Sequence, residues 1–141
     1  IRTFFVNFSL NMSINESKLW AFIKQCKKTQ KNWHFFRLES HTINGIPDVY
    51  GCMHGQPFWI ELKATLVENR GLSKWQWNWH IDHNRAGGKS YILNANDKES
   101  CYEILVIREP RALVLVKSYP YDHNHNHIAT ITEILITMSQ S

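Results

Sequence analysis

The chain has 141 residues, the size of one domain, and its 43% hydrophobic and 13% aromatic content exclude a disordered chain. A net charge of +4 suits a polyanionic partner, although many proteins that never bind nucleic acid share it. No apolar run approaches the ~20 residues that span a bilayer, so we expect a soluble protein with no membrane partner. The three widely spaced cysteines exclude a disulfide framework and a zinc knuckle, and indicate reduced, intracellular thiols.

The first helix is predicted over residues 15–29. Ser13 and Glu16 have the S-x-x-E spacing of a capping box, and Leu19, Ile23 and Cys26 then recur at helical spacing. Met12 directly precedes this pattern and is a candidate natural start. We therefore treat 1–12 as an N-terminal extension that need not be native, and expect one domain over 13–141.

Basic residues cluster on and after this helix. Between Glu16 and Glu39 there are six basic residues and no acidic one. Without other evidence, a solvated helix face is the better explanation of such a cluster. If a DNA-cleaving site lies downstream, contact with the phosphate backbone becomes the better interpretation. The candidates for phosphate contacts are Lys24, Lys27, Lys28, Lys31, Arg37 and, further along the chain, Lys74.

Strands are predicted over residues 33–38, 47–53 and 58–64, with 54–57 as a hairpin loop. Further strands are expected over 90–93, 102–107 and 112–116. Residues 128–138 favour a closing helix, although their threonines and isoleucines also suit a strand. Since no linker or internal repeat is present, we expect a core over 13–94 and a C-terminal extension over 95–141.

Residues 73–86 carry an ambiguous pattern. Tryptophans alternate as in a strand, but Ser73 and Gln76 have capping-box spacing and Gly87 supplies a stop, which favours a helix. On that helix Trp75 and Trp79 share one face, and Trp77 and Ile81 share the opposite face. A helix that is apolar on both sides is usually buried on both sides. We expect one side to cover the sheet and the Trp77/Ile81 face to form a homodimer.

The candidate site consists of two acids and a lysine. Asp48 lies on one predicted strand, and Glu61 lies on the strand that returns beside it. Glu61 and Lys63, two residues apart, project from the same face of that strand. Carboxylates are suitable ligands for Mg²⁺, and a lysine can position the attacking water or stabilise charge on a phosphate. Alternatively, Asp48 is a turn residue and the other two are exposed strand charges.

The complete sequence motif around these residues is more specific than the two acids and the lysine alone. It runs from Gly45-Ile46-Pro47-Asp48 through a hairpin to Glu61-Leu62-Lys63, and then to Leu72-Ser73-Lys74-Trp75-Gln76 at a helix start. With it, the chain resembles the PD-(D/E)XK nuclease superfamily, in particular the stand-alone VRR-NUC nucleases of phages and the archaeal Holliday-junction resolvases. The resemblance covers roughly residues 13–94.

The resemblance implies an α/β fold with an α-β-β-β-α-β core and a mixed sheet, here followed by a strand pair and a helix. It implies Asp48, Glu61 and the Leu62 carbonyl as ligands of Mg²⁺, for which Mn²⁺ can substitute, and Lys63 and Gln76 as further catalytic residues. Glu16 matches an acid of the first helix, either as a metal ligand or only as half of a capping box.

The function implied is metal-dependent DNA endonuclease activity on branched DNA such as Holliday junctions, by a homodimer without a small-molecule cofactor. The context would be phage replication, recombination or repair, in the host cytoplasm. Two alternatives remain open. One is a sequence-specific restriction or homing-type endonuclease, and the other is a DNA-binding module of the same fold that does not cleave.

Two histidine patterns are discounted. The segment from His123 to His127 spells H-N-H-N-H, but HNH nucleases spread their residues over a ββα-metal scaffold, so we expect an exposed polar loop. His80 and His83 lie three apart without a third metal ligand at suitable spacing, and are expected on a helix surface.

Overall fold

The computed structural model describes residues 13–38, 43–65, 67–122 and 124–141. The expected N-terminal extension over 1–12, with the candidate start at Met12, and His123 of the histidine segment lie outside the described residues. The elements follow in the order α2 (Glu16–Lys28), β1 (Trp33–Arg37), β2 (Val49–Met53), β3 (Gln56–Lys63), η1 (Glu68–Gly71), α3 (Lys74–Arg85), β4 (Ser90–Asn96), β5 (Cys101–Arg108), β6 (Ala112–Pro120) and α4 (His127–Gln140).

The strands form one sheet in the order β1-β2-β3-β4-β5-β6. β3 and β4 pair in parallel, because the segment with α3 returns the chain to the end of the sheet at which β3 begins. The other neighbouring strands pair antiparallel. The predicted α/β fold is therefore confirmed, with its α-β-β-β-α-β core, mixed sheet, added strand pair and closing helix. Residues 128–138 lie within a helix rather than a strand.

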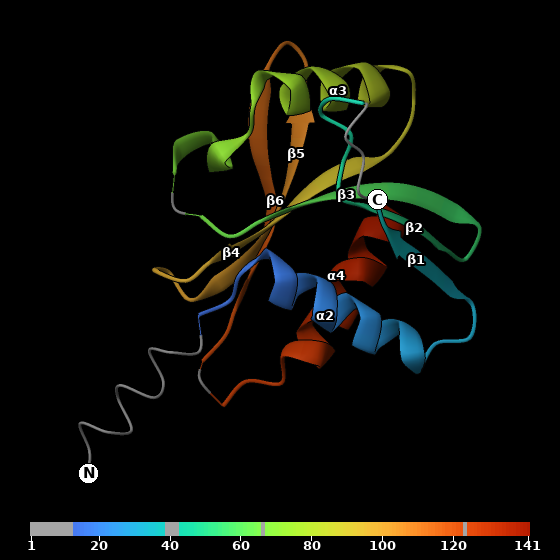
Figure 1. Cartoon of the computed structure of the whole chain (residues 1–141), viewed down its shortest axis with the longest axis vertical. Helices are drawn as coiled ribbons and strands as arrows, with labels where there is room; N and C mark the ends of the chain where they lie inside the picture. Colours follow the sequence, from blue (N-terminus) through green and yellow to red (C-terminus); the bar gives the residue numbers. More distant parts are fainter. Residues whose placement is uncertain (1–12, 39–42, 66, 123) are drawn as a thin grey trace.

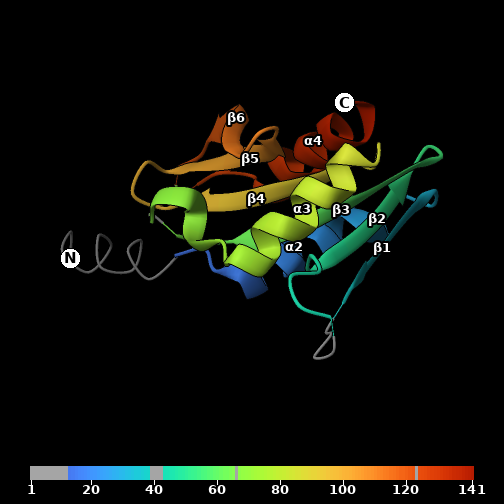
Figure 2. The same ribbon diagram turned by 90° about the horizontal axis from the view of Figure 1, so that it is seen from above.

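Helices cover the two faces of the sheet unequally. Figure 1 shows α2 and α4 together on one side and α3 alone on the other. The larger core lies under α2 and α4, where Leu19, Ile23, Ile134 and Leu135 are fully buried against the strands. Figure 2, seen from the side of α3, shows β1 and β2 extending beyond that helix. Among the described residues, no helix is long and apolar enough to cross a bilayer.

The buried side of α3 differs from the expectation. Trp77 is 8% exposed and forms a second core with Ile92, Leu105 and Ile107, against which Ile81 packs. The Trp77/Ile81 face therefore covers the sheet of its own chain, and its assignment to a homodimer contact is wrong. The homodimer itself remains a prediction.

The placement of His80 on a helix surface is also wrong. Its side chain is fully buried, and Nδ1 lies 2.7 Å from Ser90 Oγ on β4. The reason is that His80 follows Trp77 by three residues and shares its inward face.

The two predicted helix starts have different outcomes. At α2 the N-cap is Asn15, whose side chain accepts a hydrogen bond from Lys18 N at 2.8 Å. Glu16 is then the first helical residue rather than the third, so the predicted Ser13–Glu16 capping box is wrong. Asparagine is as strong an N-cap as serine, which explains the shift. At α3 the capping box of Ser73 and Gln76 is confirmed.

Candidate metal and phosphate site

Asp48 and Glu61 meet where β2 begins and β3 approaches its end. Val49 pairs with Ile60, so Asp48, one residue earlier, lies opposite Glu61 on the same face of the sheet. The Asp48 carboxylate accepts a hydrogen bond from the Leu62 backbone N at 2.9 Å. This bond joins the loop before β2 to β3 and fixes Asp48 beside Glu61. The structure thus brings together the two acids on which the sequence prediction depends.

Glu61 is a buried carboxylate with an incomplete set of partners. Its side chain is only 2% exposed, Oε2 accepts a hydrogen bond from Gln76 Nε2 at 3.2 Å, and Oε1 accepts none from any described residue. Burial raises its pKa well above the ordinary carboxyl value, and the hydrogen bond and negative charge of Asp48 raise it further, against a smaller opposing effect of Lys63. In the metal-free protein Glu61 is therefore protonated near neutral pH.

Gln76 caps α3 and also contacts Glu61. Its Oε1 accepts a hydrogen bond from Ser73 N at 2.8 Å, which completes the capping box, while its Nε2 donates to Glu61. The two ends of one amide therefore connect the first turn of α3 to the site. Gln76 fixes the position of Glu61 through Oε2, and Oε1 stays available to another ligand.

Lys63 and Glu16 lie around this pair. Lys63 Nζ donates to the Gly71 carbonyl at 3.4 Å, and neither of the two ion pairs found within the described ranges involves it. The pKa of Glu16 is raised, first by burial and then by the charge of Asp48, while Lys63 and Arg37 act in the opposite direction. Glu16 at the start of α2 therefore lies close enough to interact electrostatically with Asp48 and Lys63.

An open cleft of about 400 Å³ leads to Asp48. Its lining includes Arg37, Asp48, Ser73 and Gln76. Gly45 closes one side, and a Cβ atom there would lie 2.2 Å from the Trp75 carbonyl oxygen, while its φ of +83° also favours glycine. The glycine of the Gly45-Ile46-Pro47-Asp48 phrase therefore allows the loop to pack against the first turn of α3.

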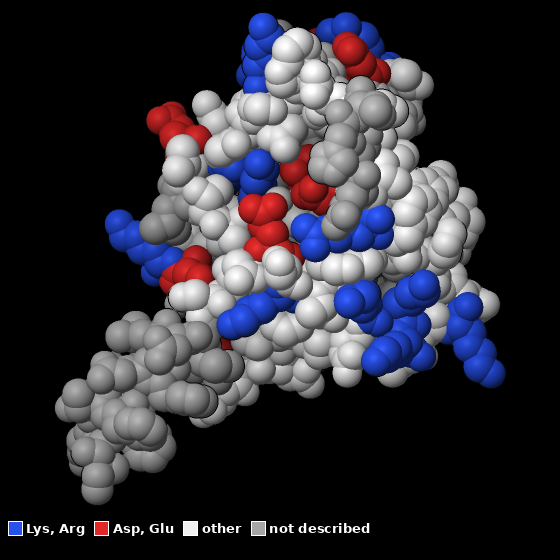
Figure 3. All heavy atoms as spheres, in the orientation of Figure 1, with Lys and Arg blue, Asp and Glu red and all other residues white. Residues whose placement is uncertain are grey.

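The predicted phosphate-contact residues divide into two groups. Arg37 lines the cleft, and Lys74 lies beside it with Nζ 5.1 Å from the centre of the Trp75 ring. The second group is exposed on the C-terminal half of α2 and the turn that follows, and comprises Lys24, Lys27, Lys28 and Lys31. Figure 3 shows acidic atoms near the centre of this face with basic atoms on either side, and a further basic group over that end of α2.

The donor set fits a hard divalent cation. Two neighbouring carboxylates, one with an unpartnered buried oxygen, are stable as anions only if a cation compensates them, and carboxylate and carbonyl oxygens are the ligands that Mg²⁺ prefers. Asp48, Glu61 and the Leu62 carbonyl would hold it. No group of three or more His, Cys, Asp or Glu side chains with metal-holding geometry occurs among the described residues, and the role of Glu16 as a further ligand stays a prediction.

Sequence reasoning missed a buried network beside Lys63. Arg70 forms two hydrogen bonds to Glu103, at 2.8 and 3.0 Å, and Asn94 donates to Glu103 at 2.8 Å and to the Thr65 carbonyl at 3.0 Å. These contacts tie the segment after β3 to β4 and β5, and so hold the Gly71 carbonyl that Lys63 contacts. No local pattern predicts the Arg70–Glu103 pair, because 33 residues separate its members.

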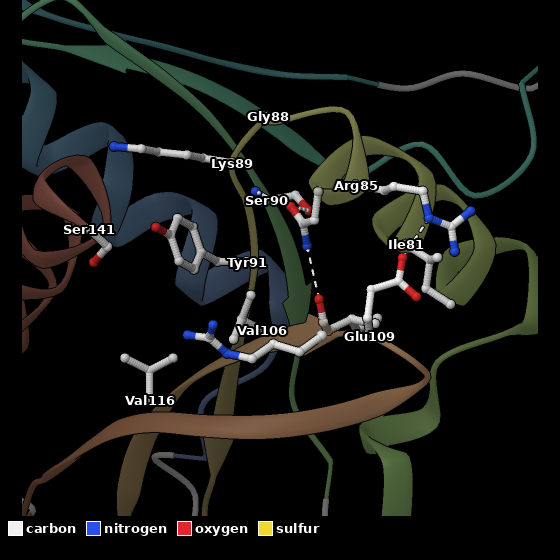
Figure 4. Close-up of a pocket in the computed structure, with 13 residues that line it drawn as sticks. Ile81, Arg85, Gly88, Lys89, Ser90, Tyr91, Val106, Glu109, Val116 and Ser141 are labelled. Carbon is white, nitrogen blue, oxygen red and sulfur yellow. Dashed lines mark hydrogen bonds and ion pairs between the residues drawn. The ribbon is translucent and has the colours of Figure 1, made fainter.

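A larger cavity of about 640 Å³ lies away from the carboxylates, between the end of α3 and strands β4, β5 and β6. Figure 4 shows Arg85 and Glu109 paired at its rim and Tyr91, Val106 and Val116 along its wall. Lys89 and Arg108 also line it, while its one acidic side chain, Glu109, is already paired with Arg85, so these lining residues form no carboxylate pair like that of Asp48 and Glu61.

Compared with models of known protein families and with curated protein sequences, the chain matches none. The case for a function therefore depends on the geometry of the site and on the sequence resemblance.

Proposed function

We propose that this chain is a metal-dependent DNA endonuclease that hydrolyses phosphodiester bonds in branched DNA, in the manner of the PD-(D/E)XK nucleases. The observation that carries the proposal is the pair of acids. Glu61 is buried with one oxygen that has no partner among the described residues, beside Asp48, which lines an open cleft, and two residues before Lys63 on the same strand. Buried, perturbed acids in a cleft are a frequent sign of a functional site.

In the proposed reaction Asp48, Glu61 and the Leu62 carbonyl would hold Mg²⁺ or Mn²⁺. When bound, the cation neutralises charge on the phosphate and lowers the pKa of the attacking water. Gln76 keeps the Glu61 carboxylate in its orientation through Oε2. Lys63 positions the water or the phosphate, which suits an ammonium whose contact is a carbonyl rather than a carboxylate.

The DNA backbone would enter along the cleft. We propose that Arg37, which lines the cleft, and Lys74, beside it, contact phosphates there, where the N-terminus of α3 also favours a negative charge. The lysines of α2 extend the basic surface beyond the cleft. Such contacts give affinity without sequence preference. The proposed location is the cytoplasm, that of the host cell if the protein is phage-encoded, and the proposed assembly is a homodimer.

The test is a cleavage assay on a four-way junction, a flap and a linear duplex, with Mg²⁺ and with a chelator. Glu61→Gln and Lys63→Ala should each lower the cleavage rate at least about 100-fold while DNA binding is retained. Matched controls are Glu133→Gln and Lys117→Ala, which alter exposed charges on α4 and β6. Cleavage at the wild-type rate by both site variants would refute the proposal. Binding to DNA without cleavage under any condition would favour the non-cleaving module, and cleavage at one duplex sequence would favour the restriction type.

A further inference from the structure

Aromatic side chains form a continuous row on the α3 side of the sheet, across the part of that face that no helix of the described residues covers. The ring centres of Phe36 on β1 and Tyr50 on β2 lie 5.4 Å apart, those of Tyr50 and Trp59 on β3 lie 5.1 Å apart, and those of Trp59 and Trp79 on α3 lie 5.5 Å apart. His34 flanks the row, 5.6 Å from the Phe36 ring. We call Phe36, Tyr50, Trp59 and Trp79 the aromatic row.

The row is accessible rather than part of either core. Phe36 is 40% exposed, and the other three rings are half-buried. Neither buried cluster among the described residues includes any of them. An outward sheet face is ordinarily polar, so three strands that each place a ring here need a reason other than packing.

The row lies directly beside the two acids. Tyr50 pairs with Trp59, and the next pair on the same face of β2 and β3 is Asp48 with Glu61. Two residues along a strand span about 7 Å. A base attached to a nucleotide next to the reacting phosphate could therefore reach the rings while the phosphate stays at the carboxylates.

Positive charge accompanies the row along the β1 edge. Arg37, which follows Phe36 in β1, lines the cleft, and Lys27 Nζ, which comes from α2, donates to the Phe35 carbonyl of the same strand at 3.5 Å. Rings flanked by cations match single-stranded DNA, whose bases stack on aromatic side chains while its phosphates pair with Lys and Arg. A symmetric contact between two copies through this face would bring these cationic edges towards each other, which disfavours a second copy as the occupant.

We propose that the aromatic row binds unpaired bases of a single-stranded DNA segment adjacent to the cleaved phosphodiester. This inference rests on the proposed nuclease function and narrows its substrate: the preferred DNA has an unpaired stretch beside the cleavage point. A fully paired duplex hides its base faces by stacking, so it would gain nothing from the row.

The test compares wild type with Phe36→Leu and Tyr50→Leu, each of which removes a ring but keeps an apolar side chain. Affinity for a fluorescent oligo-dT and for a blunt duplex is measured by anisotropy in a chelator, so that the result does not depend on cleavage. Each variant should bind oligo-dT about ten-fold more weakly and the duplex as wild type does. Leu115→Ala, which truncates a 50%-exposed side chain on β6, should bind both as wild type does.

Unchanged oligo-dT affinity in Phe36→Leu and Tyr50→Leu overturns the inference. If sedimentation shows in addition that a wild-type dimer becomes a monomer in these variants, the row is a subunit contact instead. Equal weakening towards oligo-dT and duplex also overturns the inference, because it shows no selectivity for unpaired bases. Ring-dependent oligo-dT binding by a protein that cleaves no DNA would refute the nuclease function and leave the binding surface in place.

Discussion

The protonated state of Glu61 leads to a test of stability that requires no substrate. Glutamine has the shape of a protonated glutamate, so in Glu61→Gln it can donate towards Asp48 and still accept from Gln76 Nε2. Wild-type protein carries a proton on Glu61 when folded at pH 7 and releases it on unfolding. The substitution removes that difference between the two states.

The size of this effect on stability follows from how far the pH lies above the ordinary carboxyl pKa. Between the ordinary carboxyl value of 4.5 and the raised pKa of the folded state, folded protein binds more protons than unfolded protein, so stability falls as pH rises. Each pH unit corresponds to about 1.4 kcal/mol, which gives about 3 kcal/mol between pH 4.5 and pH 7. Glu61→Gln should therefore be more stable than wild type by up to about 3 kcal/mol at pH 7, equivalent to a Tm about 10 °C higher. The gap should disappear near pH 4.5.

The assay is urea and thermal unfolding in a chelator between pH 4.5 and pH 8. Glu103→Gln is the matched control, because burial raises the pKa of Glu103 but the hydrogen bonds from Arg70 and Asn94 outweigh it, and the net pKa is lowered. That substitution should destabilise the protein at pH 7. If Glu61→Gln is less stable than wild type, or its advantage does not change with pH, Glu61 is ionised in the metal-free protein and the reasoning fails.

Three further predictions concern the metal, the loop and the helix start. Mg²⁺ at 100 times its Kd should stabilise wild type by about 2.7 kcal/mol and Glu61→Gln hardly at all. The affinity of wild type for Mg²⁺ should rise with pH, because binding displaces the proton of Glu61. Binding that calorimetry shows to be independent of pH would contradict this prediction. Gly45→Ala should lower the free energy of unfolding more than Gly55→Ala does. Both glycines have positive φ, but only at Gly45 would a Cβ press against Trp75. Equal losses of unfolding free energy in urea would refute the close contact. Ser73→Ala should cost about 1 kcal/mol of stability through the lost cap, with little change in cleavage rate. Gln76→Ala should lower both the stability and the cleavage rate. An unchanged cleavage rate in Gln76→Ala would refute its role at the site.

The sequence was sufficient for the order and type of every predicted element and for the juxtaposition of Asp48 and Glu61, because alternation on two hairpin strands determines which side chains share a face. It was not sufficient for the orientation of α3. Apolar residues surround that helix, so the pattern alone does not say which side meets the sheet. That choice is made by the crossover from β3 to β4, which turns Trp77 and His80 inward.

Electrostatic features were beyond the sequence for a different reason. The raised pKa of Glu61 depends on burial together with an acid thirteen positions away, and the Arg70–Glu103 pair joins residues whose spacing carries no signal. The sequence predicted the cap at Gln76 but not its contact with Glu61, which the other end of the same amide makes.

The position of β3 in the sheet has a consequence for how DNA could enter. β3 is bonded on both sides, to β2 and to β4, whereas β1 is bonded within the sheet only to β2 and lies at its edge. Edge strands open locally at lower free energy than central ones. Backbone amides of β1 should therefore exchange with solvent hydrogen well before those of β3. The Arg37 end of β1, which lines the cleft, should therefore open more readily than the part of β3 that carries Glu61.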